Sequence, residues 1–364
     1  MRRWHRMAIY SLQFVDWFLR NIRRFMRWLL GKNKNIPLHI DGYWGYAHRD
    51  FAFLKGRVLM DKKIQPKDED SKFRNFVNTF KRFASDEIPH AELRVEIQDN
   101  HFQLTASEKG YFTLESELPT PLQLPVSGQV CEARITLEKA KYLQGEAPQT
   151  TIPLLFPGPG TPFGVISDVD DTILQSYITS PLKLRAFYAT FFHNAATRKE
   201  VAGAAAFFQE LKERANKAIP FFYVSNSPWN LYDLLLNFLE KNKFPVGPIL
   251  LREIKSSTRK IANHAKGHKY RAIVKLLTAY PDMPFILIGD SGEKDAEIYR
   301  SIDHQFPGRI RAIIIREVAR RRTSINKKLY QKLEDDPKVI WLTAFTENHP
   351  VWENLNIPDF SKMS

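Results

Sequence analysis

Cysteine is almost absent from this chain. Cys131 is the only cysteine among 364 residues, so the chain can form no internal disulfide and has no cluster of cysteine ligands for zinc. The sequence therefore does not require an oxidising compartment, and Cys131 is expected to be a small core residue. Internal repeats and low-complexity tracts are absent as well.

Acidic residues are fewer than basic ones. The chain has 40 Asp and Glu against 54 Lys and Arg, which gives a net charge of +14. Such a balance favours anionic partners, namely lipid headgroups, nucleic acid or polyphosphates. Nucleic acid is the least favoured of these, because the basic residues lack interleaved aromatic residues outside the N-terminal segment.

Residues 1–34 lack the uninterrupted run of roughly 20 apolar residues that a membrane span needs. At about 100° per residue, five large apolar side chains fall on one helical face and four arginines on the opposite one. This pattern predicts a basic amphipathic helix that lies on an anionic membrane surface, in a cytoplasmic protein peripheral to the membrane. Docking of the apolar face on the protein itself explains the pattern as well, whereas Asp16 and the lack of a cleavage site disfavour a signal peptide.

The length of the chain favours two domains with extensions. Residues 36–155 contain short runs of alternating apolar and polar residues, such as Leu93–Ile97, with turn residues such as Gly110 between them. They predict a small antiparallel β-sandwich. A linker rich in proline and glycine follows at 157–162.

Residues 160–320 alternate between apolar strands and helical patterns. This alternation predicts an α/β domain with a doubly wound parallel sheet. The expected strands lie near 164–168, 219–225, 248–252, 285–289 and 309–315. The expected helices lie near 180–194, 199–216, 228–242, 267–280 and 293–302. The C-terminal extension, residues 321–364, shares a basic cluster with the preceding residues and has a possible late strand at 337–346.

Two aspartates, Asp168 and Asp170, stand at the end of the first strand of this domain. In an open α/β sheet ligands bind beyond the carboxyl ends of the strands, where acids can offer oxygen ligands to Mg²⁺ and a carboxylate nucleophile. The pair therefore points to phosphoryl transfer. Capping of a following helix by Asp171 or Thr172 is the structural alternative.

Further polar motifs follow in the same region. Ser225 and Asn226 end the second strand, Lys269 opens a helical stretch, and Asp290 and Asp295 follow a third apolar strand. A phosphomonoester with Mg²⁺ needs carboxylates for the metal, and a hydroxyl and a lysine for the phosphate oxygens. The plainer interpretations are a helix cap for the serine, a solvated basic face for the lysine and a turn for the two acids.

Together these motifs resemble, in order and in type, those of the haloacid dehalogenase superfamily. The runs Val-Ser-Asn-Ser-Pro-Trp at 224–229 and Leu-Ile-Gly-Asp-Ser-Gly-Glu-Lys-Asp at 287–295 are more specific. They resemble the catalytic domain of the actin-patch-protein type of phosphatidate phosphatase. The resemblance covers residues 160–320, and a looser one extends to the preceding domain.

The resemblance implies a role for each acid. Asp168 would attack phosphorus to form an aspartyl-phosphate, and Asp170 would protonate the leaving alkoxide and then activate water. Mg²⁺ would be held by Asp168, the backbone carbonyl of Asp170 and Asp290, with Asp295 supporting the metal shell.

The remaining motif residues are implied to bind phosphate. Ser225, Asn226 and Lys269 would hold the phosphoryl oxygens, and Thr172, at the same site, would orient Asp170. The segment from Ile173 to Phe192, where the superfamily places a cap, is short and would leave room for a large substrate.

The sequence thus predicts a Mg²⁺-dependent phosphatidate phosphatase that hydrolyses phosphatidic acid to diacylglycerol and phosphate. One alternative is a phosphatase that acts on another phosphomonoester. Another is a catalytically idle interaction module at a membrane surface, against which the retention of all four motifs speaks.

Overall fold

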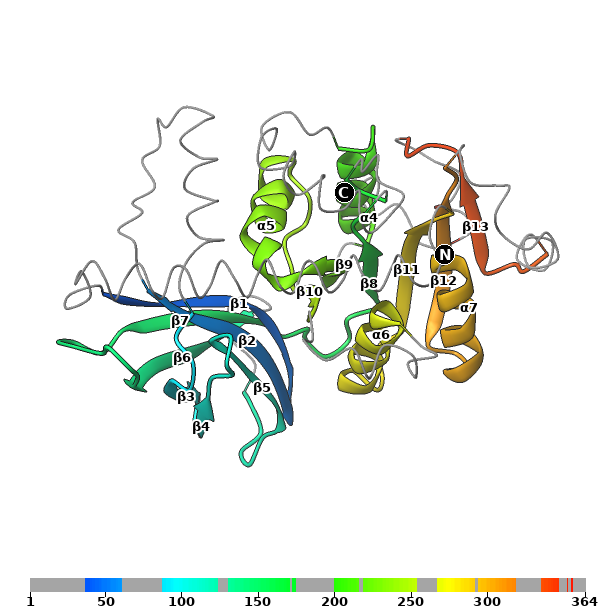
Figure 1. The fold of residues 1–364 in the computed structure, drawn as a ribbon. Coiled ribbons are helices and arrows are strands. Elements are labelled where there is room, and N and C mark those ends of the chain that lie inside the picture. Colours follow the sequence, from blue (N-terminus) through cyan, green and yellow to red (C-terminus); the bar gives the residue numbers. More distant parts are fainter. Residues whose placement is uncertain are drawn as a thin grey trace, which may run out of the picture.

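The protein consists of two sheets that lie side by side, with helices around the second (Figure 1). The computed structural model describes residues 37–60, 87–123, 130–170, 172–174, 200–215, 219–253, 267–291, 294–318 and 335–346, with 352 and 355. The predicted N-terminal helix, the helix near 180–194, most of the segment from Ile173 to Phe192 and the basic residues 320–328 lie outside the described residues. Within the described residues, no helix is long and apolar enough to span a membrane.

The first sheet contains seven strands in the order β4-β3-β6-β7-β1-β2-β5. Their bounds are β1 Leu38–His48, β2 Phe51–Met60, β3 Glu92–Ile97, β4 Asn100–Thr105, β5 Tyr111–Glu117, β6 Val130–Lys139 and β7 Gln149–Leu155. All neighbours pair antiparallel except β1 and β7, which are parallel. The edge strands β4 and β5 lie close to each other, so the sheet curls around its own core. The predicted antiparallel strands are thus present, but the predicted β-sandwich is not formed by the strands that the structure describes, because they belong to one curled and mostly antiparallel sheet.

Alternation along these strands decides which side chains enter the core. In β3, Leu93, Val95 and Ile97 are fully buried between exposed or half-exposed neighbours. Gly110 occupies the turn before β5 with φ 72°, and a Cβ there would lie 2.6 Å from the Val58 carbonyl oxygen. The turn needs glycine for both reasons.

The second sheet contains six parallel strands in the order β10-β9-β8-β11-β12-β13. Their bounds are β8 Gly164–Asp168, β9 Phe221–Pro228, β10 Ile249–Arg252, β11 Phe285–Asp290, β12 Ile310–Arg316 and β13 Val339–Leu342. The chain runs outward from β8 to β10 and then returns to β11 on the other side of β8. This change of direction is the doubly wound arrangement that the sequence predicted, and it lies between β8 and β11.

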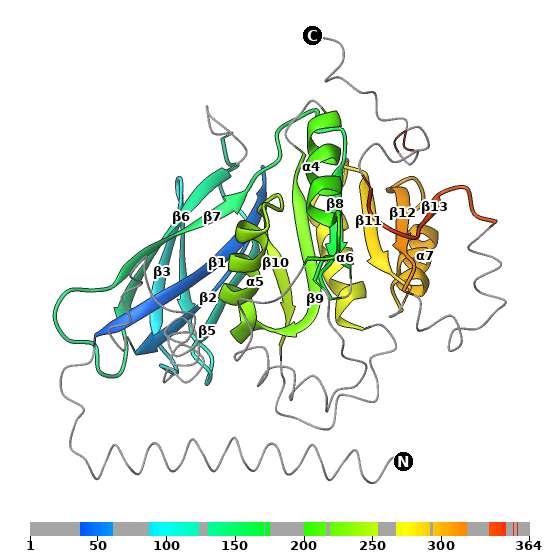
Figure 2. The ribbon, with the colours of Figure 1, turned by 90° about the horizontal axis from the view of Figure 1, so that it is seen from above.

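Helices cover both faces of this sheet (Figure 2). They are α4 Ala204–Arg214, the 3-10 turn η1 Trp229–Leu231, α5 Tyr232–Lys241, α6 His268–Ala279 and α7 Asp295–Gln305. The apolar side chains of α4 and α5 share one core with alternate strand residues, and those of α6 and α7 share the opposite core. Because both faces are covered, the central strands read as continuous apolar runs.

Part of the predicted C-terminal extension packs with the parallel sheet. Strand β13 pairs with β12, as the late strand at 337–346 suggested. Trp352 is buried and stacks on Phe207 of α4, with the ring centroids 4.7 Å apart. The guanidinium of Arg214 lies 5.3 Å from the centre of the Trp352 ring.

The outer face of the curled sheet packs against the parallel sheet and its helices. Tyr46, Phe53 and Leu155 share a core with Phe222 and Tyr280. The Tyr280 hydroxyl lies 3.2 Å from the backbone oxygens of both Ala47 and Leu155, either of which can accept its hydrogen bond. The two sheets therefore share an apolar core.

Candidate active site

The predicted polar side chains meet at the carboxyl edge of the parallel sheet. Asp168 ends β8, Asp290 ends the neighbouring β11, and Asp295 begins α7. On the other side of β8, Val224 of β9 pairs with Asp168, so Ser225 follows directly at the same edge. The order of the strands brings these distant residues together.

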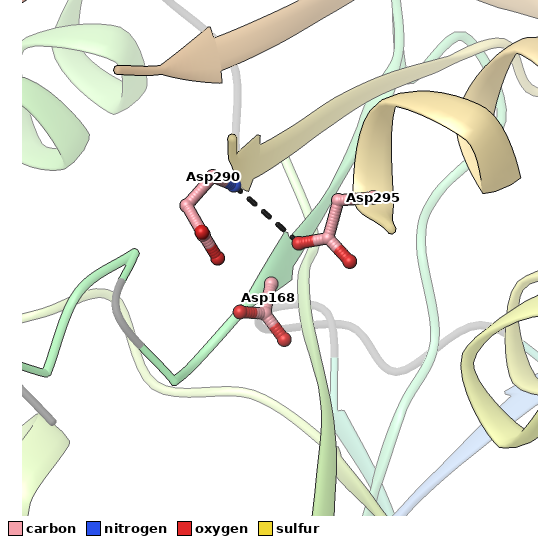
Figure 3. A group of neighbouring side chains, drawn as sticks. All are labelled: Asp168, Asp290 and Asp295. Atoms are coloured by element: carbon pink, nitrogen blue, oxygen red, sulfur yellow. Dashed lines mark hydrogen bonds between the residues drawn. The ribbon is translucent and has the colours of Figure 1, made fainter. Parts of the chain in front are cut away.

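The three acids point toward one another (Figure 3). Asp168, Asp290 and Asp295 are all buried, and one carboxylate oxygen from each lies within 4.8 Å of the others. The backbone N–H of Asp290 donates to Asp295 Oδ2 at 3.4 Å. Asp295 also lies in the first turn of its helix, where the backbone N–H groups favour a negative charge.

Gly289 makes this arrangement sterically possible. A Cβ at this position would lie 2.7 Å from Asp295 Oδ2 and 2.9 Å from the Tyr299 ring. The Tyr299 hydroxyl donates to the Ile288 carbonyl at 3.0 Å, and burial raises the pKa of that hydroxyl well above its usual value. Tyr299 packs beside these acids and was not predicted from the sequence, although its spacing of four residues from Asp295 places both on one face of α7.

Lys269 brings a positive charge into the cluster. Its Nζ lies 2.6 Å from Asp168 Oδ1 and 2.7 Å from Asp295 Oδ1, and its side chain is only 3% exposed. A solvated basic face is thus excluded for this lysine. One ammonium balances one of the three carboxylates, so the cluster retains excess negative charge.

Ser225 contacts the second acid of the first motif. Its hydroxyl donates to Asp170 Oδ2 at 2.7 Å and accepts from the Ser227 N–H at 2.9 Å. Pro228 precedes η1, and no side chain caps that turn, so Ser225 is not a helix cap. Asn226 is half-buried one residue further along β9.

Thr172 contacts a different acid from the one expected. It is fully buried, and its hydroxyl donates to Asp168 Oδ2 at 3.3 Å. The expectation that Thr172 orients Asp170 differs from this geometry, in which Ser225 contacts Asp170. The chain turns after Asp170, because Ile173 and Leu174 N–H groups bond to the Val169 carbonyl, and this turn returns Thr172 toward β8.

Ser291 fixes the end of the third motif. Its N–H donates to the Arg316 carbonyl at 2.9 Å, and its side-chain oxygen accepts from the Val318 N–H at 2.9 Å. These bonds tie the residue after Asp290 to the end of β12. The plain turn interpretation of Asp290 does not account for its burial within β11.

Comparison with known proteins shows that the segment carrying this site is similar to a known catalytic domain. Residues 163–317 match the family model described as the catalytic domain of phosphatidate phosphatase APP1. Phosphatidate phosphatase APP1 of Saccharomyces cerevisiae is 36% identical over 154 residues, which are 42% of this chain and 25% of the yeast protein. An uncharacterized protein of Schizosaccharomyces pombe is 26% identical over 253 residues, which are 68% of this chain and 40% of that protein.

A carbohydrate acetylesterase of Xanthomonas citri aligns with 75% of this chain and 66% of its own at 13% identity. Its TM-score of 0.24 is too low to support any likeness of fold. The chain spans 25% and 40% of the lengths of the two curated relatives, so the relation holds for the matched part. The resemblance seen in the motifs therefore agrees with these comparisons, in which residues 163–317 are similar to the catalytic domain of phosphatidate phosphatase APP1.

Proposed function

We propose that this protein is a Mg²⁺-dependent phosphatidate phosphatase that hydrolyses phosphatidic acid to diacylglycerol and phosphate. The observation that carries the proposal is the buried cluster of Asp168, Asp290, Asp295 and Lys269 within the segment that matches the phosphatidate phosphatase catalytic domain. We also assign the doubly wound domain to the haloacid dehalogenase type, on the order of its strands and motifs.

The donor set fits a hard divalent cation. Carboxylate oxygens are the ligands that Mg²⁺ prefers, and three of them converge here within 4.8 Å. Lysine balances one carboxylate, and a divalent cation would balance the other two. Asp168 and Asp290 would hold the ion together with the backbone carbonyl of Asp170, and Asp295 would support this shell. When bound, the ion would neutralise charge on the phosphoryl oxygens.

Asp168 is the nucleophile in this proposal. Lys269 and Thr172 contact its two carboxylate oxygens, which orients the group at the strand end. An oxygen of Asp168 forms a bond to phosphorus while the ester P–O bond breaks. The product of this first step is an aspartyl-phosphate.

Asp170 supplies and removes the protons. It protonates the leaving alkoxide of diacylglycerol, and the resulting carboxylate then accepts a proton from the water that hydrolyses the aspartyl-phosphate. Before substrate binds, the bond from Ser225 fixes one oxygen of Asp170. Lys269, Ser225 and Asn226 then hold the phosphoryl oxygens, as the motif resemblance implies.

A membrane-bound substrate fits the charge of the chain. The net charge of +14 favours an anionic surface, and residues 1–34 would contact it as a basic amphipathic helix. We therefore propose that the enzyme is cytoplasmic and peripheral to the membrane, where it reaches the phosphate of a lipid without extracting the lipid.

The test is release of phosphate from phosphatidic acid in mixed micelles. Wild-type protein should require Mg²⁺ and lose activity with a chelator, and Asp168→Asn should lose at least about 1,000-fold in kcat because the nucleophile is gone. Hydrolysis of soluble phosphomonoesters without hydrolysis of micellar phosphatidic acid would favour the alternative substrate class. Full activity of Asp168→Asn would contradict the mechanism.

A further inference from the structure

The curled sheet buries a lysine against the parallel sheet. Lys55 of β2 is 3% exposed, and its cross-strand neighbours are Tyr43 of β1 and Thr113 of β5. Its Nζ lies 2.6 Å from Glu253 Oε1 and donates to Thr113 Oγ1 at 3.0 Å. A buried ammonium needs such partners, because removing it from water is costly.

The same ammonium faces the turn that follows Ser225. It lies 5.2 Å from the centre of the Trp229 ring, within the range of a cation–π contact. Trp229 is buried and also stacks on Tyr43 of β1, with ring centroids 5.2 Å apart and planes inclined by 19°. Tyr43 and Lys55 are paired neighbours on β1 and β2, so the two together form one side of a clamp on Trp229.

A further contact reaches the neighbouring strand end. Glu253 follows β10 directly, and Arg252 of β10 pairs with Pro228 of β9. Lys55 therefore touches both the residue just after β9 and the residue just after β10. Only three residues lie between Ser225 and Trp229, and all three belong to β9.

The clamp extends to the first turn of α5. Tyr232 accepts a hydrogen bond at 2.7 Å from the backbone N–H of Trp44, and its ring lies 4.5 Å from that of Tyr43. The chain from Trp229 to Tyr232 is thus held on one side by strands β1 and β2. The strand end that carries Ser225 continues into this held segment.

We propose that Lys55 is a positioning residue of the active site. Through Trp229 and Glu253 it fixes the end of β9, and so it places the Ser225 hydroxyl that bonds to Asp170. The curled sheet then contributes to catalysis, because the position of Asp170 depends on the contacts that Lys55 and Tyr43 make with Trp229. The effect on turnover rests on the proposed function, whereas the effect on the β9 end does not.

The experiment is a double-mutant cycle between Lys55→Met and Ser225→Ala, with kcat and KM measured on micellar phosphatidic acid. Methionine keeps the length of the side chain and removes its charge. Misplacement of a catalytic group commonly costs about 10- to 100-fold, so Lys55→Met should lower kcat by about 10-fold with little change in KM. In the Ser225→Ala background the same change should have almost no further effect, since the positioned hydroxyl is already missing.

Matched controls separate positioning from general loss of the interface. Lys275 and Glu115 form another ion pair between the two sheets, at 2.5 Å, on α6 and β5. Lys275→Met and Glu115→Gln should leave kcat unchanged, whereas Glu253→Gln should reduce it as Lys55→Met does. Glu253 is 55% exposed, so Glu253→Gln is expected to fold. This variant tests the proposal if Lys55→Met does not fold.

Amide hydrogen exchange provides a readout that needs no activity. Exchange of the peptide 224–231 should be faster in Lys55→Met and in Glu253→Gln than in wild type, and unchanged in the two controls. Unchanged exchange, or an equal loss of kcat with and without Ser225, would overturn the proposal. If wild type does not hydrolyse phosphatidic acid but the exchange changes as expected, the proposed function fails and the positioning of the β9 end stands.

Discussion

Replacing Lys269 by methionine tests the charge balance of the cluster. The ammonium is 2.6 Å from Asp168 Oδ1 and 2.7 Å from Asp295 Oδ1, in a side chain that is 3% exposed. Methionine has a similar length and no charge. The variant would therefore leave three buried carboxylates near one another without their lysine.

The magnitude follows from these distances. At 4.8 Å and an effective dielectric constant of about 20, two carboxylates repel each other by roughly 3 kcal/mol. Breaking a buried ion pair by removing one partner costs about 3–5 kcal/mol. Without divalent ions the melting temperature should therefore fall by roughly 10 °C.

Mg²⁺ should stabilise the variant more than the wild type. An ion that binds the folded state at 100 times its dissociation constant contributes about 2.7 kcal/mol, and the contribution grows with affinity. Because the variant has lost a competing positive charge, its affinity for the ion should rise. Hydrolysis should nevertheless fall, since the lysine is also needed for the phosphoryl oxygens.

Thermal unfolding with chelator and with increasing MgCl₂ measures both effects. Lys275→Met, on the exposed side of the same helix, is the control and should unfold like wild type at every Mg²⁺ concentration. A variant that is as stable as wild type in chelator, or that gains less stability from Mg²⁺, would show that Lys269 does not balance the charge of these acids.

Two further predictions concern glycine and cysteine. Gly289→Ala should lower kcat by about 100-fold and stability by about 1–3 kcal/mol, because the new Cβ would lie 2.7 Å from Asp295 Oδ2. Gly158→Ala, where no atom lies within 4 Å, should change neither, and equal effects of the two would contradict this account. Burial raises the pKa of the Cys131 thiol from 9.0 to about 11, so a thiol reagent should label it slowly below pH 9 in the folded protein. Because the unfolded thiol ionises first, this contribution to stability should be complete below pH 9 and lost as the pH rises through about 11, and Cys131→Ala should remove that component.

The strands of the parallel sheet could be predicted from the sequence because they are short apolar runs with acids or a serine at their ends. The predicted strand 164–168 and the observed β8 coincide, and the other strands differ by a few residues. Once the strand order is known, the meeting of Asp168, Asp290 and Ser225 follows from the parallel arrangement. The order of the motifs was therefore enough to predict most residues of the site.

The contacts between the two sheets could not be predicted in the same way. Lys55 and Arg57 alternate with apolar residues in β2, which is also the pattern of a solvated strand face, yet both are buried. Only the position of the second domain decides between burial and exposure there. The parallel pairing of β1 with β7 could not be predicted either, because it joins strands that are far apart in the chain.

The contacts that Thr172 and Ser225 make with the two acids have a local cause. Both are hydroxyl residues next to the acids, and spacing alone does not tell which carboxylate each one reaches. The turn after Asp170 brings Thr172 back to Asp168, while β9 brings Ser225 to Asp170. Such choices depend on backbone turns that a residue pattern does not specify.

The central claim is that Asp168 attacks phosphorus, with the other strand-end groups gathered around it. The most direct measurement is borohydride trapping of the protein during turnover of phosphatidic acid with Mg²⁺, followed by mass spectrometry of the peptide that contains residue 168. The account predicts a reduced acyl-phosphate at Asp168 that is absent without substrate. Trapping at another residue, or sustained turnover with an unmodified Asp168, would contradict it.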